Sequence, residues 1–165
     1  MTDHSFSECM AEYKKQMQTR LIPKAYKGLM DYILDLRNYF KKKYPDWSVS
    51  GSLYTGYMDM TYFALVPESL KQRGLKIAVV FIHDTCRFEV WLSAVNKQVQ
   101  AEYWQKINDS GWSTYRLVPS VQGYDSILEE ILAESSDFND LDGLTGQIEK
   151  GSLEFINAIE EFLTD

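Results

Sequence analysis

The residues of this sequence best suited to chemistry are two carboxylates, Asp59 and Glu89. Each lies in a segment whose alternation of polar and apolar residues predicts a β-strand. Acids on neighbouring strands can hold a divalent metal ion together with a substrate phosphate, as metal-dependent enzymes do. The alternative is structural, with Glu89 pairing with Lys76 or Arg87 across an ordinary sheet face. The residue types fit both interpretations, and we favour the structural one.

Aromatic and charged side chains gather around these carboxylates when the faces of the strands are followed. Tyr57 and Asp59 are two residues apart, as are Glu89 and Trp91, so each pair lies on one face of its strand. Aromatic rings with polar tips, next to small serines, are typical of a pocket for a small ligand or a peptide. We therefore predict a ligand-binding face without a catalytic residue, metal or cofactor. Its residues are Tyr54, Tyr57, Asp59, Lys76, Arg87, Glu89 and Trp91.

Two consecutive β-hairpins, within residues 47–95, must position this face. In the first hairpin, Thr55 and Gly56 would form a two-residue loop in which Gly56 has a positive φ and Tyr54 faces Tyr57. The core face of this hairpin would then carry Trp47, Val49, Leu53, Met58, Met60 and Tyr62. The opposite face would carry Ser48, Ser50, Ser52, Tyr54, Tyr57, Asp59 and Thr61.

The second hairpin covers residues 75–94 and turns around Asp84 and Thr85. Its predicted register makes one face almost entirely apolar, with the pairs Phe81 and Phe88, Val79 and Val90, and Ile77 and Leu92. The opposite face pairs Val80 with Glu89, Ile82 with Arg87, Ala78 with Trp91, and Lys76 with Ser93. We expect both hairpins to join in one antiparallel sheet, packed by a helix over residues 24–44.

Amphipathic helices are predicted on both sides of the hairpins by apolar residues at helical spacing. They cover residues 6–19, 24–44, 97–110, 124–134 and 140–164, and a short strand covers residues 114–118. Asp125 or Ser126 would cap the helix over residues 124–134. This order of elements predicts an α+β fold that forms a single domain over residues 1–165.

A segment near the C-terminus resembles a calcium-binding loop but lacks its first ligand. Loop positions 3, 5, 6 and 12 are occupied by Asp140, Asp142, Gly143 and Glu149. Position 1, which requires an acid, is Phe138. We therefore expect no stoichiometric calcium, and we interpret the two aspartates as charge partners of the N-terminus of the last helix.

Other motifs of catalysis or metal binding are weaker. The two histidines and two cysteines show no spacing typical of zinc ligands, and no glycine-rich phosphate loop occurs. The net charge of −7 disfavours binding to nucleic acid, because such binding requires cations that neutralise phosphates. Lys41, Lys42 and Lys43 could form a local phosphate-binding patch, but we favour a role in complementing the C-terminal dipole of a helix.

Composition indicates a soluble intracellular protein of one domain. The chain has 165 residues, of which 45% are hydrophobic and 25% charged, as in ordinary globular domains. No apolar run approaches the ~20 residues needed to span a bilayer, and residues 1–17 lack the apolar stretch of a signal peptide. Cys9 and Cys86 lie far apart in the sequence, which favours reduced thiols and a cytoplasmic location.

Four runs of the sequence together resemble an uncharacterised bacterial family, a domain of unknown function. The runs, within residues 24–100, are KAYKGLMDYILDLRNYFKKKYPD, GSLYTGYMDMTYF, PESLKQRGLKIAVVF and FEVWLSAVNKQVQ. The resemblance extends over nearly the whole chain. It implies a stand-alone cytosolic protein and assigns no catalytic residue.

A second resemblance is topological and concerns the restriction-endonuclease-like PD-(D/E)xK nucleases, which carry two acids on neighbouring central strands. Asp59 and Glu89 would be those acids. The sequence departs from the nuclease motif, because Trp91 stands where a lysine is required and the predicted sheet has an extra strand. Without that lysine, the group expected to position or activate the attacking water is missing.

Three functions of different classes therefore remain open. The first, which we favour, is a non-enzymatic binding module that holds a small molecule or a peptide on the aromatic and acidic face. The second is a metal-dependent or degenerate nuclease-like enzyme that uses Asp59 and Glu89. The third is a structural, self-associating protein in which a second copy covers that face. A cleft on the face would favour the first two, and a two-fold contact over it would favour the third.

Overall fold

The computed structural model describes residues 3–164, and the chain divides into two compact units, Met1–Asp35 and Leu36–Asp165. The first unit contains α1 (Phe6–Gln18) and the beginning of α2 (Leu21–Lys43). A capping box starts α1: the Ser5 hydroxyl accepts a hydrogen bond from the Glu8 backbone N–H, and the Glu8 carboxylate accepts one from the Ser5 backbone N–H. In α2, Lys27 and Asp31 form an exposed ion pair one helical turn apart.

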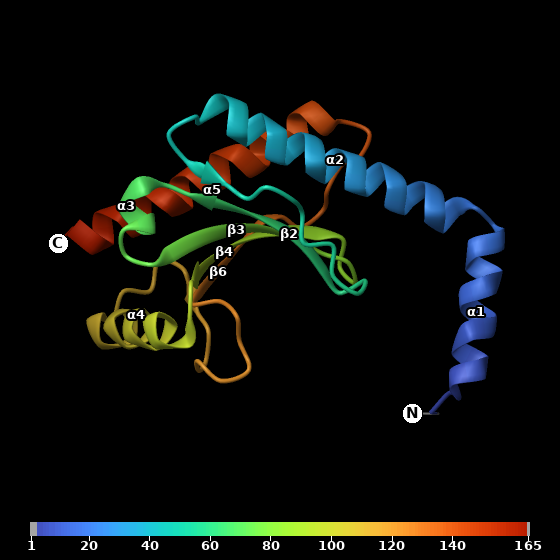
Figure 1. Ribbon diagram of the computed structural model, residues 1–165, viewed down its shortest axis with the longest axis horizontal. Helices are drawn as coiled ribbons and strands as arrows, with labels where there is room; N and C mark the ends of the chain where they lie inside the picture. The colour runs from blue at the N-terminus through green and yellow to red at the C-terminus, as the bar shows by residue number, and fades with distance from the viewer. Residues whose placement is uncertain (1–2, 165) are drawn as a thin grey trace. The chain divides into compact units, whose positions relative to one another are not determined.

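The second unit is built on a six-stranded sheet with the order β1-β2-β3-β4-β6-β5, in which every neighbouring pair is antiparallel. The strands are β1 (Ser48–Val49), β2 (Met60–Val66), β3 (Leu75–Ile82), β4 (Arg87–Ala94), β5 (Arg116–Leu117) and β6 (Leu128–Ala133). The remaining helices are α3 (Glu68–Lys71), α4 (Lys97–Ser110) and α5 (Leu141–Thr164). The helix α5 runs along one face of the sheet, and α4 lies on the other side (Figure 1). The predicted α+β class with an antiparallel sheet is confirmed.

The second hairpin, formed by β3 and β4, has the register that the sequence predicts. Phe81 pairs with Phe88, and the other predicted pairs continue along the whole hairpin. Its apolar face is buried and faces the core. The inward side of α5 completes this core with Leu144, Ile148, Phe155, Ile156 and Ile159. The ring of Phe40, in the last turns of α2, lies 6.1 Å from the ring of Phe63 and extends the core beneath β2.

The loop predicted for the first hairpin is wrong. Tyr54 pairs with Tyr62 instead of facing Tyr57, and a wide loop over residues 55–59 replaces the two-residue turn. Gly56 has the expected positive φ of 71°, and a Cβ there would clash with the Met60 carbonyl oxygen. The Asp59 carboxylate accepts a hydrogen bond from the Tyr57 backbone N–H at 2.8 Å. Side-chain bonds of this kind stabilise wide loops and compete with a tight turn.

The predicted faces of the residues that form β2 are also reversed. Thr61, Phe63 and Leu65 are buried on the core face, where they pair with core residues of β3. Met60, Tyr62 and Ala64 alternate with them and therefore lie on the opposite face. Phe63 and Leu65 bury more apolar area than Met60 and Tyr62 would, and the period of two forces the whole strand to follow that choice.

Residues 128–133 form the strand β6, so the predicted helix over residues 124–134 is wrong. Leu, Glu and Ala favour helices, and the apolar residues of this segment have helical spacing. The strand β4, however, has a buried edge whose backbone N–H and C=O groups require partners. Pairing with β6 supplies them, with Val90 opposite Glu130. The expected helix caps Asp125 and Ser126 instead precede a strand.

Asp140 caps α5, in agreement with its predicted place at the start of the last helix. Its carboxylate accepts a hydrogen bond from the Gly143 backbone N–H at 3.0 Å, and Asp142 lies in the first turn. Further along α5, a Cβ at Gly151 would lie 2.5 Å from a methyl carbon of Leu132. Glycine at this position therefore allows α5 to approach β6 closely.

Glu149 joins α5 to the end of α2 within the second unit. Its carboxylate accepts hydrogen bonds from the hydroxyls of Tyr39 and Tyr44, at 2.8 and 2.5 Å, and pairs with Lys43 Nζ at 2.8 Å. Burial favours the neutral acid, but the bonds from these three residues outweigh it and lower the pKa of Glu149. Burial, together with the neighbouring carboxylate, raises the pKa of Tyr44 to about 12, so its hydroxyl remains a donor.

We expect Glu149→Gln to destabilise the protein by about 1.5–3 kcal/mol at pH 7, because hydrogen bonds to a charged group are stronger than those to a neutral one. The pKa of Glu149 is lower in the folded than in the unfolded state. Its stabilisation is therefore complete above the unfolded pKa, about 4.3, and is lost as the pH falls through the folded value.

Urea unfolding from pH 7 to pH 3 tests this expectation. The stability difference between wild type and Glu149→Gln should stay constant above about pH 5 and shrink in more acidic solution. Glu161→Gln, at an exposed position of the same helix, is the control and should change stability by less than about 0.5 kcal/mol. A difference that is independent of pH would contradict the role of the carboxylate charge.

Candidate functional site

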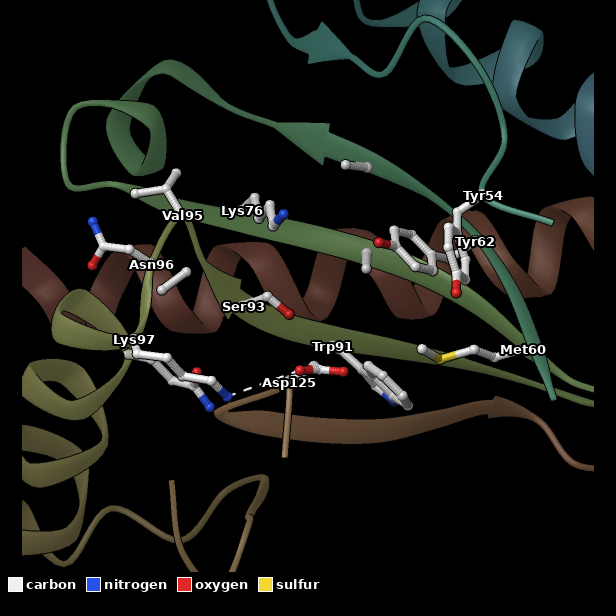
Figure 2. Close-up of a pocket in the computed structure, with 14 residues that line it drawn as sticks. Tyr54, Met60, Tyr62, Lys76, Trp91, Ser93, Val95, Asn96, Lys97 and Asp125 are labelled. Atoms are coloured by element: carbon white, nitrogen blue, oxygen red, sulfur yellow. Dashed lines mark ion pairs between the residues drawn. The ribbon is translucent and has the colours of Figure 1, made fainter. Parts of the chain in front are cut away.

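A concavity of about 400 Å³ opens on the face of the sheet turned away from α5 (Figure 2). Its floor is formed by β2, β3 and β4, one side by the segment around Tyr54, and another by the first turn of α4. The floor is hollow because small side chains occupy its centre, where Ala64 pairs with Ala78. Larger side chains surround these positions, so the strands create an open space at the middle of the face.

The aromatic end of the pocket consists of Tyr54, Tyr62 and Trp91, with Met60 beside them (Figure 2). The rings of Tyr54 and Tyr62 lie 4.9 Å apart between centroids. The indole N–H of Trp91 donates a hydrogen bond to Glu89 at 2.9 Å. The other oxygen of the Glu89 carboxylate accepts a hydrogen bond from Arg87 Nε at 2.6 Å. Because Glu89 is only 5% exposed, this chain of bonds holds Trp91 in one orientation before any ligand arrives.

The polar end of the pocket consists of Lys76, Ser93, Asn96 and Lys97. Asn96 is the N-cap of α4, and its side chain accepts a hydrogen bond from the Val99 backbone N–H at 2.9 Å. Lys97 donates to the Tyr124 carbonyl at 2.8 Å and lies 3.9 Å from the carboxylate of Asp125. This end therefore combines two ammonium groups, a hydroxyl and the start of a helix.

The phenol of Tyr62 remains a neutral donor at physiological pH. Burial raises its pKa, and the neighbouring Tyr54 and Asp125 raise it further. The pocket thus contains the cations Lys76 and Lys97 and the anion Asp125, and the hydroxyl of Tyr62 carries no charge. Its formal charge is positive, although the whole chain carries −7.

Comparison with known proteins identifies a family. The model of one family, described as Domain of unknown function (DUF7000), matches residues 6–163. The chain belongs to the DUF7000 family. This match confirms the predicted membership of a family of unknown function. No curated protein and no solved structure matches the chain. None of the helices within residues 3–164 combines the length and the hydrophobicity that a transmembrane helix requires.

Three of the seven predicted site residues of the DUF7000 protein line the pocket, namely Tyr54, Lys76 and Trp91. Arg87 and Glu89 lie beside it on the same face of β4 and support Trp91. The other two, Tyr57 and Asp59, are exposed in the loop over residues 55–59. The structure thus brings five of the predicted residues to one face, three of them in the pocket lining, and leaves the other two in the loop.

The structure does not bring Asp59 and Glu89 together. The Asp59 carbonyl accepts a hydrogen bond from the His83 backbone N–H, whereas Glu89 pairs with Val80. His83 and Val80 are three residues apart, which along a strand corresponds to about 10 Å, so their partners Asp59 and Glu89 lie well apart. The Asp59 carboxylate is engaged within its own loop, where bonds from the backbone N–H groups of Tyr57 and Met60 lower its pKa. In the described part of the chain, no group of three or more His, Cys, Asp or Glu side chains could hold a metal ion.

Sequence reasoning missed several residues that line the pocket of this DUF7000 protein: Met60, Tyr62, Ser93, Asn96, Lys97, Gln100 and Asp125. The register predicted from the sequence places Tyr62 in the core, and the predicted helix over residues 124–134, which does not form, contains Asp125. Ser93 could have been found, because it lies two residues after Trp91 and therefore shares its face. Asn96 carried the sequence signal of a helix cap directly after a strand.

Proposed function

We propose that this protein binds a small organic molecule reversibly in the sheet-face pocket. The observation that carries the proposal is the aromatic end, where Glu89 holds Trp91 in place next to an open space. A volume of about 400 Å³ lies within the range of pockets for small molecules. Rings that are fixed in advance lose little conformational freedom on binding, and this favours affinity.

A small molecule fits the pocket better than a peptide does. The concavity is bounded by Tyr54 at one end and by Asn96 and Lys97 at the other (Figure 2). The strands of its floor are paired on both sides, so they offer no free edge to which a peptide could add as a further strand. We also propose a cytoplasmic location, which the exposed free thiols of Cys9 and Cys86 support.

Filling the pocket should abolish binding. We expect Ala64→Trp to lower the affinity of the pocket for every ligand by about tenfold or more, because the indole would occupy the floor between Tyr62 and Ala78. Chemical-shift changes in ¹H–¹⁵N NMR spectra, recorded with neutral, cationic and anionic fragments, measure this effect. In the wild type, fragments should shift the Trp91 indole signal and the amide signals of Ser93 and Lys97.

Ala101→Trp, at an exposed position of α4 outside the pocket, is the matched control and should retain binding. The proposal would be wrong if Ala64→Trp bound the same fragments as the wild type, or if no fragment shifted the pocket signals. It would also be wrong if sedimentation showed a wild-type dimer that Ala64→Trp dissociates, because the face would then be an interface between two copies.

A further inference from the structure

We infer that the ligand is a small organic anion with a flat apolar body. Its anionic group binds at the polar end of the pocket, beside Lys76 and Ser93, and its flat body lies against the aromatic end. This inference rests on the proposed function and specifies its ligand class. Four observations support it, three at the polar end and one at the aromatic end.

Lys76 provides a positive charge that the protein itself does not neutralise. Its side chain is half-buried and lines the pocket, yet it forms no hydrogen bond or ion pair with any residue of 3–164. The other cation, Lys97, already has Tyr124 and Asp125 as partners. Among the described residues, this ammonium group therefore has no counter-ion, although it faces the pocket. An anion in the pocket would supply the missing partner.

Ser93 provides a donor at the same place. It is 6% exposed, lines the pocket, and its hydroxyl has no hydrogen-bond partner among the described residues. Ser93 lies directly opposite Lys76 on the neighbouring strand. Side chains at opposite positions of an antiparallel pair have Cβ atoms about 5 Å apart. The hydroxyl and the ammonium can therefore bind two oxygens of one carboxylate or phosphate.

The helix α4 starts at this end of the pocket. Its N-cap, Asn96, lines the concavity together with Lys97 and Gln100 of the first turn. The N-terminus of a helix carries a partial positive charge and attracts anions. This field adds to the charge of Lys76. Asp125, the only acid among the lining residues, is paired with Lys97 and so does not cancel it.

The aromatic end sets the shape of the remaining part of the ligand. Tyr54, Tyr62 and Trp91 present ring surfaces, and Ala64 and Ala78 leave the floor flat between them. Ring surfaces favour stacking or edge contacts with another flat group. An inorganic anion would fill only the polar end, and a neutral aromatic compound would leave Lys76 without a partner.

A matched set of probes tests this inference. The first probe is 2-naphthoate, which has a flat body and a charge; 2-naphthamide has the same body without charge, and acetate has the charge without the body. We expect 2-naphthoate to bind about tenfold or more tightly than 2-naphthamide, because a hydrogen-bonded ion pair contributes more than a neutral contact. Acetate should bind too weakly to measure. 2-Naphthyl phosphate then distinguishes a phosphate ligand from a carboxylate ligand by which probe binds more tightly.

Lys76→Met keeps the length of the side chain and removes its charge. It should reduce the affinity for 2-naphthoate about tenfold and leave that for 2-naphthamide within about twofold of the wild type. Lys42→Met makes the same change of net charge at an exposed lysine of α2 and should alter neither affinity. NMR titration of the Trp91 indole signal measures each affinity at the site.

The possible outcomes separate this inference from the proposed function. If 2-naphthamide binds as tightly as 2-naphthoate, the pocket binds small molecules but the anionic ligand class is wrong. If Lys76→Met weakens both probes equally, Lys76 acts on the shape of the pocket and the inference is also wrong. If neither naphthyl probe shifts the Trp91 signal while other fragments do, the inferred ligand class is wrong and the proposed binding function stands. If no fragment shifts that signal, both the inferred ligand class and the proposed function are wrong.

Discussion

Phe81→Ala should destabilise this protein by about 3–5 kcal/mol, the range for removal of a large buried aromatic side chain that leaves a cavity. Phe81 is 2% exposed and lies in the central strand β3, between neighbours on β2 and β4. Its ring lies 5.0 Å from that of Phe88 and 5.0 Å from that of His83. Both strands next to β3 are held by backbone pairing, so the site has little freedom to collapse around the missing ring.

Urea unfolding of Phe81→Ala measures this effect, with the slope of the transition unchanged from the wild type. Phe138→Ala is the control within the same aromatic cluster. The Phe138 ring lies 6.4 Å from that of Phe81, but Phe138 is 43% exposed. Removal of its ring should therefore lower the free energy of unfolding much less. A loss below about 1.5 kcal/mol for Phe81→Ala would show that the core can repack at this position.

Arg87→Met should destabilise the protein by about 2–4 kcal/mol, because it leaves the carboxylate of Glu89 buried with Trp91 as its remaining side-chain partner. The expected loss lies below that of a fully buried ion pair, since the Arg87 side chain is 28% exposed. The double variant Arg87→Met/Glu89→Gln removes the charge as well and should recover part of the stability.

Arg116→Met is the matched control for this pair. Its guanidinium lies 3.6 Å from Glu129, but the Arg116 side chain is 63% exposed, and exposed pairs of this kind contribute less than about 1 kcal/mol. Thermal unfolding of the wild type, the two single variants and the double variant compares their stabilities. If Arg87→Met is no more harmful than Arg116→Met, Glu89 is not a structural charge. The same experiment reports on the site, because Arg87→Met should also broaden the NMR signal of the Trp91 indole.

The second hairpin and the helices on either side were accessible from the sequence because their signals are local and redundant. Several apolar residues of β3 and β4 agree on one register, and a slip by one position would expose all of them. The cap of α4 at Asn96 and the apolar stripe of α5 are signals of the same kind. Hence the α+β class, and the part of the pocket floor that β3 and β4 form, could be predicted from sequence patterns.

The first hairpin shows where such patterns fail. The sequence Tyr54-Thr55-Gly56-Tyr57 is compatible with a tight turn, and Gly56 does have a positive φ. The hydrogen bond between Asp59 and the Tyr57 backbone, and that between the Thr61 hydroxyl and the Thr55 carbonyl, stabilise a wider loop instead. A turn rule that considers two residues contains no information on these bonds, so the register that it predicts places Tyr62 on the wrong face.

Three features could be predicted from sequence patterns: the fold class, the register of β3 with β4, and the positions of Lys76 and Trp91 on one face of the sheet. Three others became visible only in the folded chain: β6 pairs with β4, Tyr62 faces the pocket, and Asp59 lies apart from Glu89. The reason is physical. Each of the first three features depends on neighbours in the chain or on a period of two. Each of the others depends on which distant strand satisfies a buried backbone edge and which side chains the core has room to bury.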